Sequence, residues 1–150
     1  MPIEALAAYY GTDGHGIQVP LNFELLEADW NARAIAAFVD RYLAVLPHGA
    51  WPNWVLGNHD TPRVASRLGP AQARVAAMLL LTLPGTPVLY YGDEIGMTDV
   101  PVGPDQVRDP IAALVPGRGR DPERSRCAGT TAPGPGSRPG GRGCRSGIRP

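Results

Sequence analysis

The residues best suited to chemistry in this sequence are Asn58, His59 and Asp60, which directly follow the apolar run 54–56 (WVL) and a glycine. The same residue types are common in turns, where a lone histidine usually satisfies one hydrogen bond. A metal site is not favoured, because His15 and His48 show no ligand-type spacing with His59. The stretch therefore predicts either a polar loop or a binding site that uses Asp60.

A second polar pair, Asp93 and Glu94, follows the apolar run 88–91 (VLYY) and another glycine. Neighbouring side chains of an extended segment point in opposite directions, so these two carboxylates cannot both face one bond. We interpret them as structural supports that cap the following turn or pair with an arginine. Met97 and the two tyrosines of the run are expected to pack rather than to bind a ligand.

Helices and strands must position these loops, and their pattern alternates along the chain. Asn31 can cap a helix that places apolar residues on one face up to residue 46, and Pro70 can begin a second helix that extends to residue 83. The runs 54–56 and 88–91 lack inside/outside alternation, which is typical of strands buried on both faces. A further, weakly patterned strand is expected within residues 17–26. The order predicts parallel β/α units with helices covering the sheet.

Parallel α/β folds place ligand sites at the carboxyl ends of their strands, where both polar stretches fall. Two or three β/α units cannot close an eight-unit barrel, which takes about 250 residues. If the units belong to a barrel, the chain therefore holds only a part of it. A small independent α/β domain is the alternative.

Two long motifs carry a family resemblance. Residues 51–63 (WPNWVLGNHDTPR) and residues 83–97 (LPGTPVLYYGDEIGM) closely resemble glycoside hydrolase family 13, the α-amylase superfamily, in the family's order and spacing. The similarity is best to its α-glucosidase and oligo-1,6-glucosidase group and extends over residues 9–123. It implies the last two or three β/α units of a (β/α)8 TIM barrel, with residues 1–125 as a partial catalytic domain.

The resemblance also implies roles for the polar loop. The family cleaves α-glucosidic bonds with retention, using a nucleophile, a general acid/base and a third carboxylate, and Asp60 aligns with the third. Asp60 would then stabilise the transition state by binding and distorting the sugar. His59 and Asn58 would contact substrate, and Arg63 would either hold Asp60 ionised, contact substrate or form a structural ion pair.

No residue of this sequence aligns with the nucleophile or the acid/base, which the family carries on earlier strands. We therefore expect no turnover from this polypeptide alone, since no glycosyl-enzyme intermediate can form without a nucleophile. The expected ligand is an α-linked gluco-oligosaccharide. The alternative function is that of a non-catalytic remnant of the same barrel that binds a sugar or a protein.

Composition excludes several other classes. The formal net charge is +0, which argues against a nucleic-acid or membrane partner for the chain as a whole. The longest apolar stretch, residues 75–83, is about half of the ~20 residues that a membrane span needs. The start of the chain lacks the basic region of a signal peptide, so we expect a cytoplasmic protein. Cys127 and Cys144 show no metal-site pattern, and we expect no cofactor.

The C-terminal segment differs from the rest. Residues 108–150 carry 9 Arg against 3 acidic residues, whereas residues 1–107 carry 5 Arg against 11. From residue 126 onward the chain is rich in Gly, Pro and Arg, which predicts a disordered tail that cannot bury a core. A charge-driven contact with RNA or a membrane is one alternative. Another is a frameshift: with one choice of synonymous codons, a single base inserted after codon 125 yields Ser-Pro-Met-Arg-Trp-Asp, which resembles the family.

Overall fold

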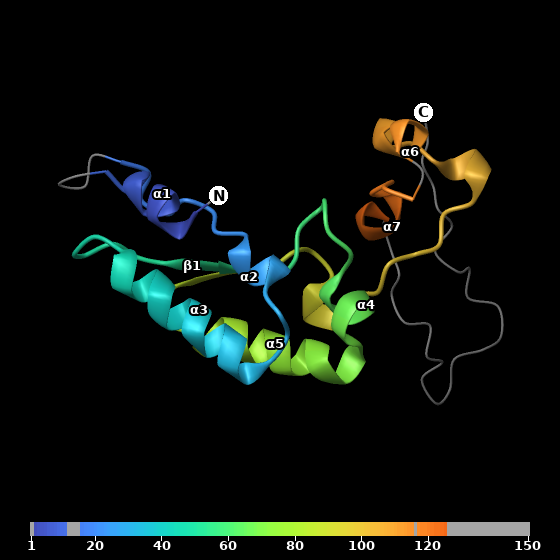
Figure 1. Cartoon of the computed structure of the whole chain (residues 1–150). Helices are drawn as coiled ribbons and strands as arrows, with labels where there is room; N and C mark the ends of the chain where they lie inside the picture. Colours follow the sequence, from blue (N-terminus) through green and yellow to red (C-terminus); the bar gives the residue numbers. More distant parts are fainter. Residues whose placement is uncertain (1, 12–15, 116, 126–150) are drawn as a thin grey trace.

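The computed structural model describes residues 2–11, 16–115 and 117–125 (Figure 1). The predicted tail, both cysteines and His15 lie outside the described residues. The elements, in chain order, are α1 (Ile3–Ala8), α2 (Glu24–Glu27), α3 (Ala32–Val45), β1 (Asn53–Val55), α4 (Val64–Leu68), α5 (Pro70–Thr82), β2 (Thr86–Val88), the 3-10 turns η1 (Asp93–Ile95) and η2 (Pro104–Gln106), α6 (Pro110–Leu114) and α7 (Asp121–Arg124).

The two long helices form where the sequence predicts them. Asn31 caps α3, since its side chain accepts a hydrogen bond from the backbone N–H of Ala34. Pro70 is the first residue of α5, where its missing N–H costs nothing. Figure 1 shows α3 and α5 on one side of the strands, and residues of both helices share the main core cluster with Trp54 of β1.

The two strands pair in parallel, as predicted, with Trp54 opposite Pro87. All three residues of β1 are buried, which confirms the prediction of a strand covered on both faces. The second strand is shorter and earlier than the predicted run 88–91, and the prediction that it is buried on both faces is wrong, because its residues are partly or fully exposed. Beyond Val88 the predicted end lies outside the sheet, where the carbonyl oxygens of Tyr90 and Tyr91 accept hydrogen bonds from the backbone N–H of Asp93 and from the Arg63 guanidinium.

The prediction of a strand within residues 17–26 is wrong. The short helix α2 begins within this segment, at Glu24. The residues before α2 pair with the side chain of Asn53 and not with a strand. The side chain of Asn53 accepts from the backbone N–H of Asn22 and donates to the carbonyl of Pro20. Pro20 has no backbone N–H and cannot donate a hydrogen bond to a neighbouring strand. The buried side-chain amide of Asn53, which both donates and accepts, pairs with the backbone of this segment instead.

Three aromatic rings pack together at the centre of the core, around Trp54 of β1. Trp54 has no exposed surface, and its ring meets those of Phe38 and Tyr42 edge to face. Its indole N–H donates to the carbonyl of Pro84, which ties the end of α5 to β1. Gly85 has φ +141°, and a Cβ there would lie 2.6 Å from the indole nitrogen, so the close approach requires glycine. This packing fixes the strand that leads into the polar loop.

Toward its C-terminal end the described chain leaves this core. The 3-10 turn η2, α6 and α7 form a separate group beyond α4, shown in orange in Figure 1. Polar side chains rather than a second apolar cluster connect α7 to the loop that follows β1. No helix among the described residues has both the length and the apolar character that a bilayer crossing requires.

Candidate functional site

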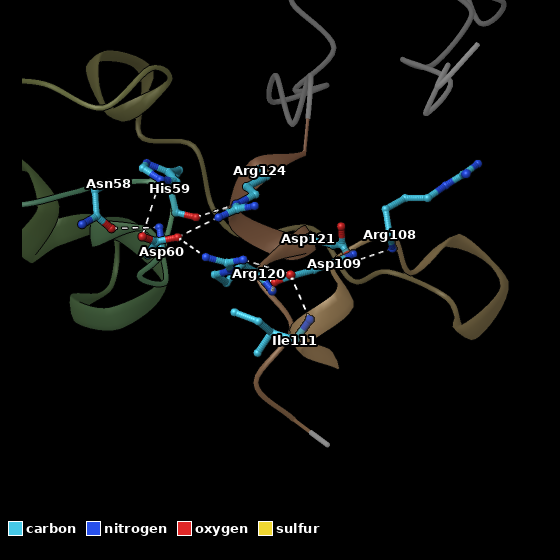
Figure 2. A network of polar contacts seen from close by, with 9 residues as sticks. All are labelled: Asn58, His59, Asp60, Arg108, Asp109, Ile111, Arg120, Asp121 and Arg124. Carbon is cyan, nitrogen blue, oxygen red and sulfur yellow. Dashed lines mark hydrogen bonds and ion pairs between the residues drawn. The ribbon is translucent and has the colours of Figure 1, made fainter. Parts of the chain in front are cut away.

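The loop after β1 presents its polar residues directly beyond the buried strand. A Cβ on Gly57 would lie 2.5 Å from a carboxylate oxygen of Asp93, so any larger residue here would have to displace that side chain. The Asn58 side chain accepts a hydrogen bond from the backbone N–H of Asp60, at 2.9 Å. Asn58 thus shapes the loop, as turn residues do. His59 Nε2 lies 3.5 Å from Oδ2 of Asp60. Figure 2 shows the two side chains next to each other.

Two arginines from α7 and its N-cap converge on Asp60. Nη1 of Arg120 and Nη2 of Arg124 each lie 2.7 Å from the same oxygen, Oδ1 (Figure 2). Partial burial pushes the pKa of Asp60 upward, but the two hydrogen bonds and the neighbouring positive charges outweigh it and hold that pKa below its ordinary value. The side chain stays 46% exposed, so Asp60 is an ionised carboxylate that a ligand can approach.

Sequence reasoning did not assign Arg120 and Arg124 to the site. The available signal is their spacing of four residues, which places both on one face of a helical turn. Arg124 also donates from Nε to the carbonyl oxygen of His59, at 2.7 Å. It therefore contacts both the backbone and the carboxylate of the polar loop.

Arg120 is held from its other side by Asp109, the N-cap residue of α6. The Nε and the backbone N–H of Arg120 donate to Oδ2 of Asp109, at 2.7 and 2.8 Å, and Nη2 of Arg120 donates to Oδ1 at 3.0 Å. These hydrogen bonds hold the pKa of Asp109 far below its ordinary value and raise that of Arg120. The guanidinium thus bridges two carboxylates.

Arg63, by contrast, lies in the interior and is not part of this cluster. It has no exposed surface, its Nη1 donates to the carbonyl of Tyr91 at 2.6 Å, and its guanidinium stacks against the rings of Tyr90 and Tyr91. The sequence left three roles open for Arg63. Arg120 and Arg124, and not Arg63, bind the Asp60 carboxylate. A direct substrate contact does not fit a side chain without accessible surface, so Arg63 has a structural position.

The second polar pair supports a turn, as predicted. Asp93 and Glu94 lie in the 3-10 turn η1 rather than in an extended segment, and Glu94 accepts the backbone N–H of Gly92 at 2.7 Å. Burial raises the pKa of Asp93, against the attraction of Arg63. Met97 is buried, which confirms its predicted packing role.

Within residues 2–11, 16–115 and 117–125, no group of three His, Cys, Asp or Glu side chains is placed to hold a metal ion. The arrangement around Asp60 suits a neutral ligand with several hydroxyl groups. The carboxylate accepts hydroxyl protons, while the imidazole and the two guanidinium groups donate to hydroxyl oxygens.

The family of the chain follows from its sequence. Residues 4–131 match the family model described as "Alpha amylase, catalytic domain", so the chain belongs to the α-amylase catalytic-domain family. This confirms the resemblance to glycoside hydrolase family 13 that the two long motifs carry. The two parallel strands and their helices are then a part of the family's barrel.

Several relatives are α-glucosidases. Maltase A1 of Drosophila melanogaster is 40% identical over 131 residues, 81% of this chain and 23% of that protein. The salivary alpha-glucosidase of Anopheles gambiae is 41% identical over 73% of this chain and 19% of that protein. The chain therefore spans about a fifth of the length of these curated relatives. The amino acid transporter heavy chain SLC3A1 of Mus musculus is 48% identical over 64 residues, 43% of this chain and 9% of that protein.

Solved structures agree with this assignment. The alpha-glucosyl transfer enzyme XgtA superposes with a TM-score of 0.70 and 32% identity, over 80% of this chain and 23% of that one. The trehalulose synthase MutB of Pseudomonas mesoacidophila MX-45 superposes with a TM-score of 0.61 and 26% identity, over 72% of this chain and 22% of that one.

Proposed function

We propose that this chain is the part of a retaining α-glucosidase-type barrel that binds the sugar ring next to the scissile bond. Asp60 would accept hydroxyl protons of the sugar, His59 would donate to a neighbouring hydroxyl, and Asn58 would fix the loop. The ligand would be an α-linked gluco-oligosaccharide. The observation that carries the proposal is the Asp60 carboxylate, which has one oxygen bonded to two arginines and a partly exposed side chain beyond β1.

We further propose that the chain does not hydrolyse α-glucosides by itself. Retention requires two carboxyl groups about 5–5.5 Å apart on either side of the scissile bond. The acids next to Asp60 in this site are engaged elsewhere: Asp109 binds Arg120, and Asp121 accepts the backbone N–H groups of residues 108 and 109. The nucleophile and the acid/base would then come from a part of the barrel that does not align with this sequence.

Exposed apolar surface supports an incomplete barrel. Met78 and Leu81 of α5 are 62% and 60% exposed, and Leu89, just after β2, is 44% exposed. Side chains of this kind are usually covered when a helix packs between neighbouring units of a barrel. Their exposure fits a chain that holds only some of those units.

Maltose binding and hydrolysis test the proposal on the purified chain. We expect two-dimensional NMR to show saturable maltose binding in the millimolar range, with shifts at residues 58–60, and no glucose release. The D60N variant should lose binding, because an amide replaces the charged acceptor, whereas D105N, which changes an exposed acid in η2, should bind normally. Glucose release by the chain would contradict the inactivity, and absence of binding would contradict the sugar site.

The match to a transporter heavy chain favours one second candidate, a non-catalytic barrel that binds a sugar or a protein. The two candidates differ in what the whole protein does. If a longer protein that contains this chain hydrolyses maltose, and D60N abolishes that hydrolysis, the enzyme is supported. If such a protein binds maltose without cleaving it, the non-catalytic function is supported.

A further inference from the structure

Asp109 is a buried acid near the loop after β1, although it belongs to neither long motif. Its side chain is 1% exposed, and both of its oxygens accept hydrogen bonds. Oδ2 accepts Nε and the backbone N–H of Arg120, while Oδ1 accepts Nη2 of Arg120 and the backbone N–H of Ile111. Asp109 does not contact Asp60 directly, so any influence on the loop passes through Arg120.

The shape of the guanidinium group makes this contact directional. The group is planar, and a carboxylate that binds two of its nitrogens fixes the plane and the direction of the third. In Arg120 the two bound nitrogens are Nε and Nη2, so the remaining Nη1 is aimed at Oδ1 of Asp60, 2.7 Å away.

Asp109 is itself fixed in place by a second acid. The Asp121 carboxylate accepts the backbone N–H groups of Arg108 and Asp109, both at 2.9 Å, so the first residue of α7 binds the backbone that directly precedes α6 (Figure 2). Asp109, which holds Arg120, is therefore itself held by hydrogen bonds of its backbone N–H to Asp121 and of its carboxylate to the backbone N–H of Ile111.

We propose that Asp109 is a positioning residue, which orients Arg120 so that its guanidinium occupies Oδ1 of Asp60 and leaves Oδ2, next to His59, to the sugar. This inference deepens the proposed function and rests on it for the identity of the ligand. The relay itself, from Asp109 through Arg120 to Asp60, depends only on contacts within the chain. It determines which atom of the carboxylate faces a sugar hydroxyl.

A double-mutant cycle on the whole 150-residue chain tests the relay. The pKa of Asp60 is followed by the 13C shift of its carboxyl group in the unmodified chain, R120M, D109N and the double variant. We expect R120M to raise this pKa, and to raise it less than half as much in the D109N background, because Arg120 without its anchor no longer points at Asp60. The direct effect of removing the Asp109 charge is common to both D109N proteins and cancels.

An effect of R120M in the D109N background that is half or more of its effect in the unmodified chain would overturn the proposal. The matched control is D105N, which makes the same chemical change in the same segment and should leave the R120M effect unaltered. If D109N does not fold, the Asp60 pKa of the R120K variant tests the proposal instead. Lysine keeps the charge but lacks the two-pronged guanidinium, so we expect the Asp60 pKa of R120K to lie closer to that of R120M than to that of the unmodified chain. An Asp60 pKa in R120K that lies closer to that of the unmodified chain would overturn the proposal.

Maltose titration of the same samples separates this inference from the function on which it rests. We expect D109N to weaken maltose binding about tenfold, or about 1.4 kcal/mol, and D105N to leave it within twofold. If the unmodified chain binds no maltose, the proposed function fails while the pKa cycle still decides the relay. If D109N binds maltose as well as the unmodified chain, the role of Asp109 in positioning the site is overturned.

Discussion

Arg124 binds the loop after β1 at two points. Its Nη2 lies 2.7 Å from Oδ1 of Asp60, and its Nε lies 2.7 Å from the carbonyl oxygen of His59. The contact joins residues 64 positions apart and brings α7 onto the candidate sugar site. Arg124 thus contributes, with Arg120, to the lowered pKa of Asp60 and also binds the backbone just before that residue.

Replacing Arg124 with methionine should raise the pKa of Asp60 toward its ordinary value. The hydrogen bond from Arg124 favours the charged form, so its loss makes the carboxylate easier to protonate. An NMR titration of the Asp60 carboxyl carbon measures this change. R33M, which changes an exposed arginine on α3, serves as the control, and an Asp60 pKa that is unchanged in R124M would contradict the contact.

Trp54 should dominate the stability of the described fold. The W54A substitution removes a fully buried ring, its edge-to-face contacts and its hydrogen bond to Pro84. We expect the free energy of unfolding in urea to fall by about 3–5 kcal/mol. W51A changes a ring that is 55% exposed and should cost less than about 1 kcal/mol. Similar losses for the two variants would show that Trp54 is not central to the core.

Glu123 should make stability depend on pH in a direction opposite to that of most acids. Burial raises its pKa, so the folded state favours the protonated acid and loses that stabilisation as pH rises through the raised value. E123Q, which cannot ionise, should therefore unfold at a temperature about 2–4 °C higher at pH 7. At pH 4 the gain should shrink, because Glu123 is then largely protonated.

Thermal unfolding at the two pH values measures the effect of E123Q. E27Q, on an exposed glutamate of α2, supplies the matched control and should change the midpoint little at either pH. A gain that is the same at pH 7 and pH 4 would assign the effect to packing rather than to ionisation.

The coding DNA tests the proposal that the tail is translated out of frame. Residues 126–150 lie outside the described part of the chain, so the nucleotide sequence is the direct measurement. We expect one inserted base near codon 126 to restore Pro-Met-Arg-Trp-Asp after Ser125, in continuity with the family motif. If no single insertion or deletion there restores this reading, the Gly/Pro/Arg tail is the true sequence.

Much of the local structure could be predicted from the sequence, because it depends on neighbours along the chain. The Asn31 cap and the period of α3, Pro70 at the start of α5 and the apolar run around Trp54 all act over a few residues. The position of Asp60 at the end of a buried strand follows from the same local pattern, as does the turn formed by Asp93 and Glu94.

The partners of these residues were decided only by the tertiary structure. Arg63 is near Asp60 in sequence, yet it turns inward, because the rings of Tyr90 and Tyr91 and the Tyr91 carbonyl receive its guanidinium. The arginines that do reach Asp60 come from 60 and 64 residues away. Local pattern sets where a strand or helix begins and which side chains lie at its end. Which charges meet there depends on how distant segments fold back, and no short-range propensity encodes that.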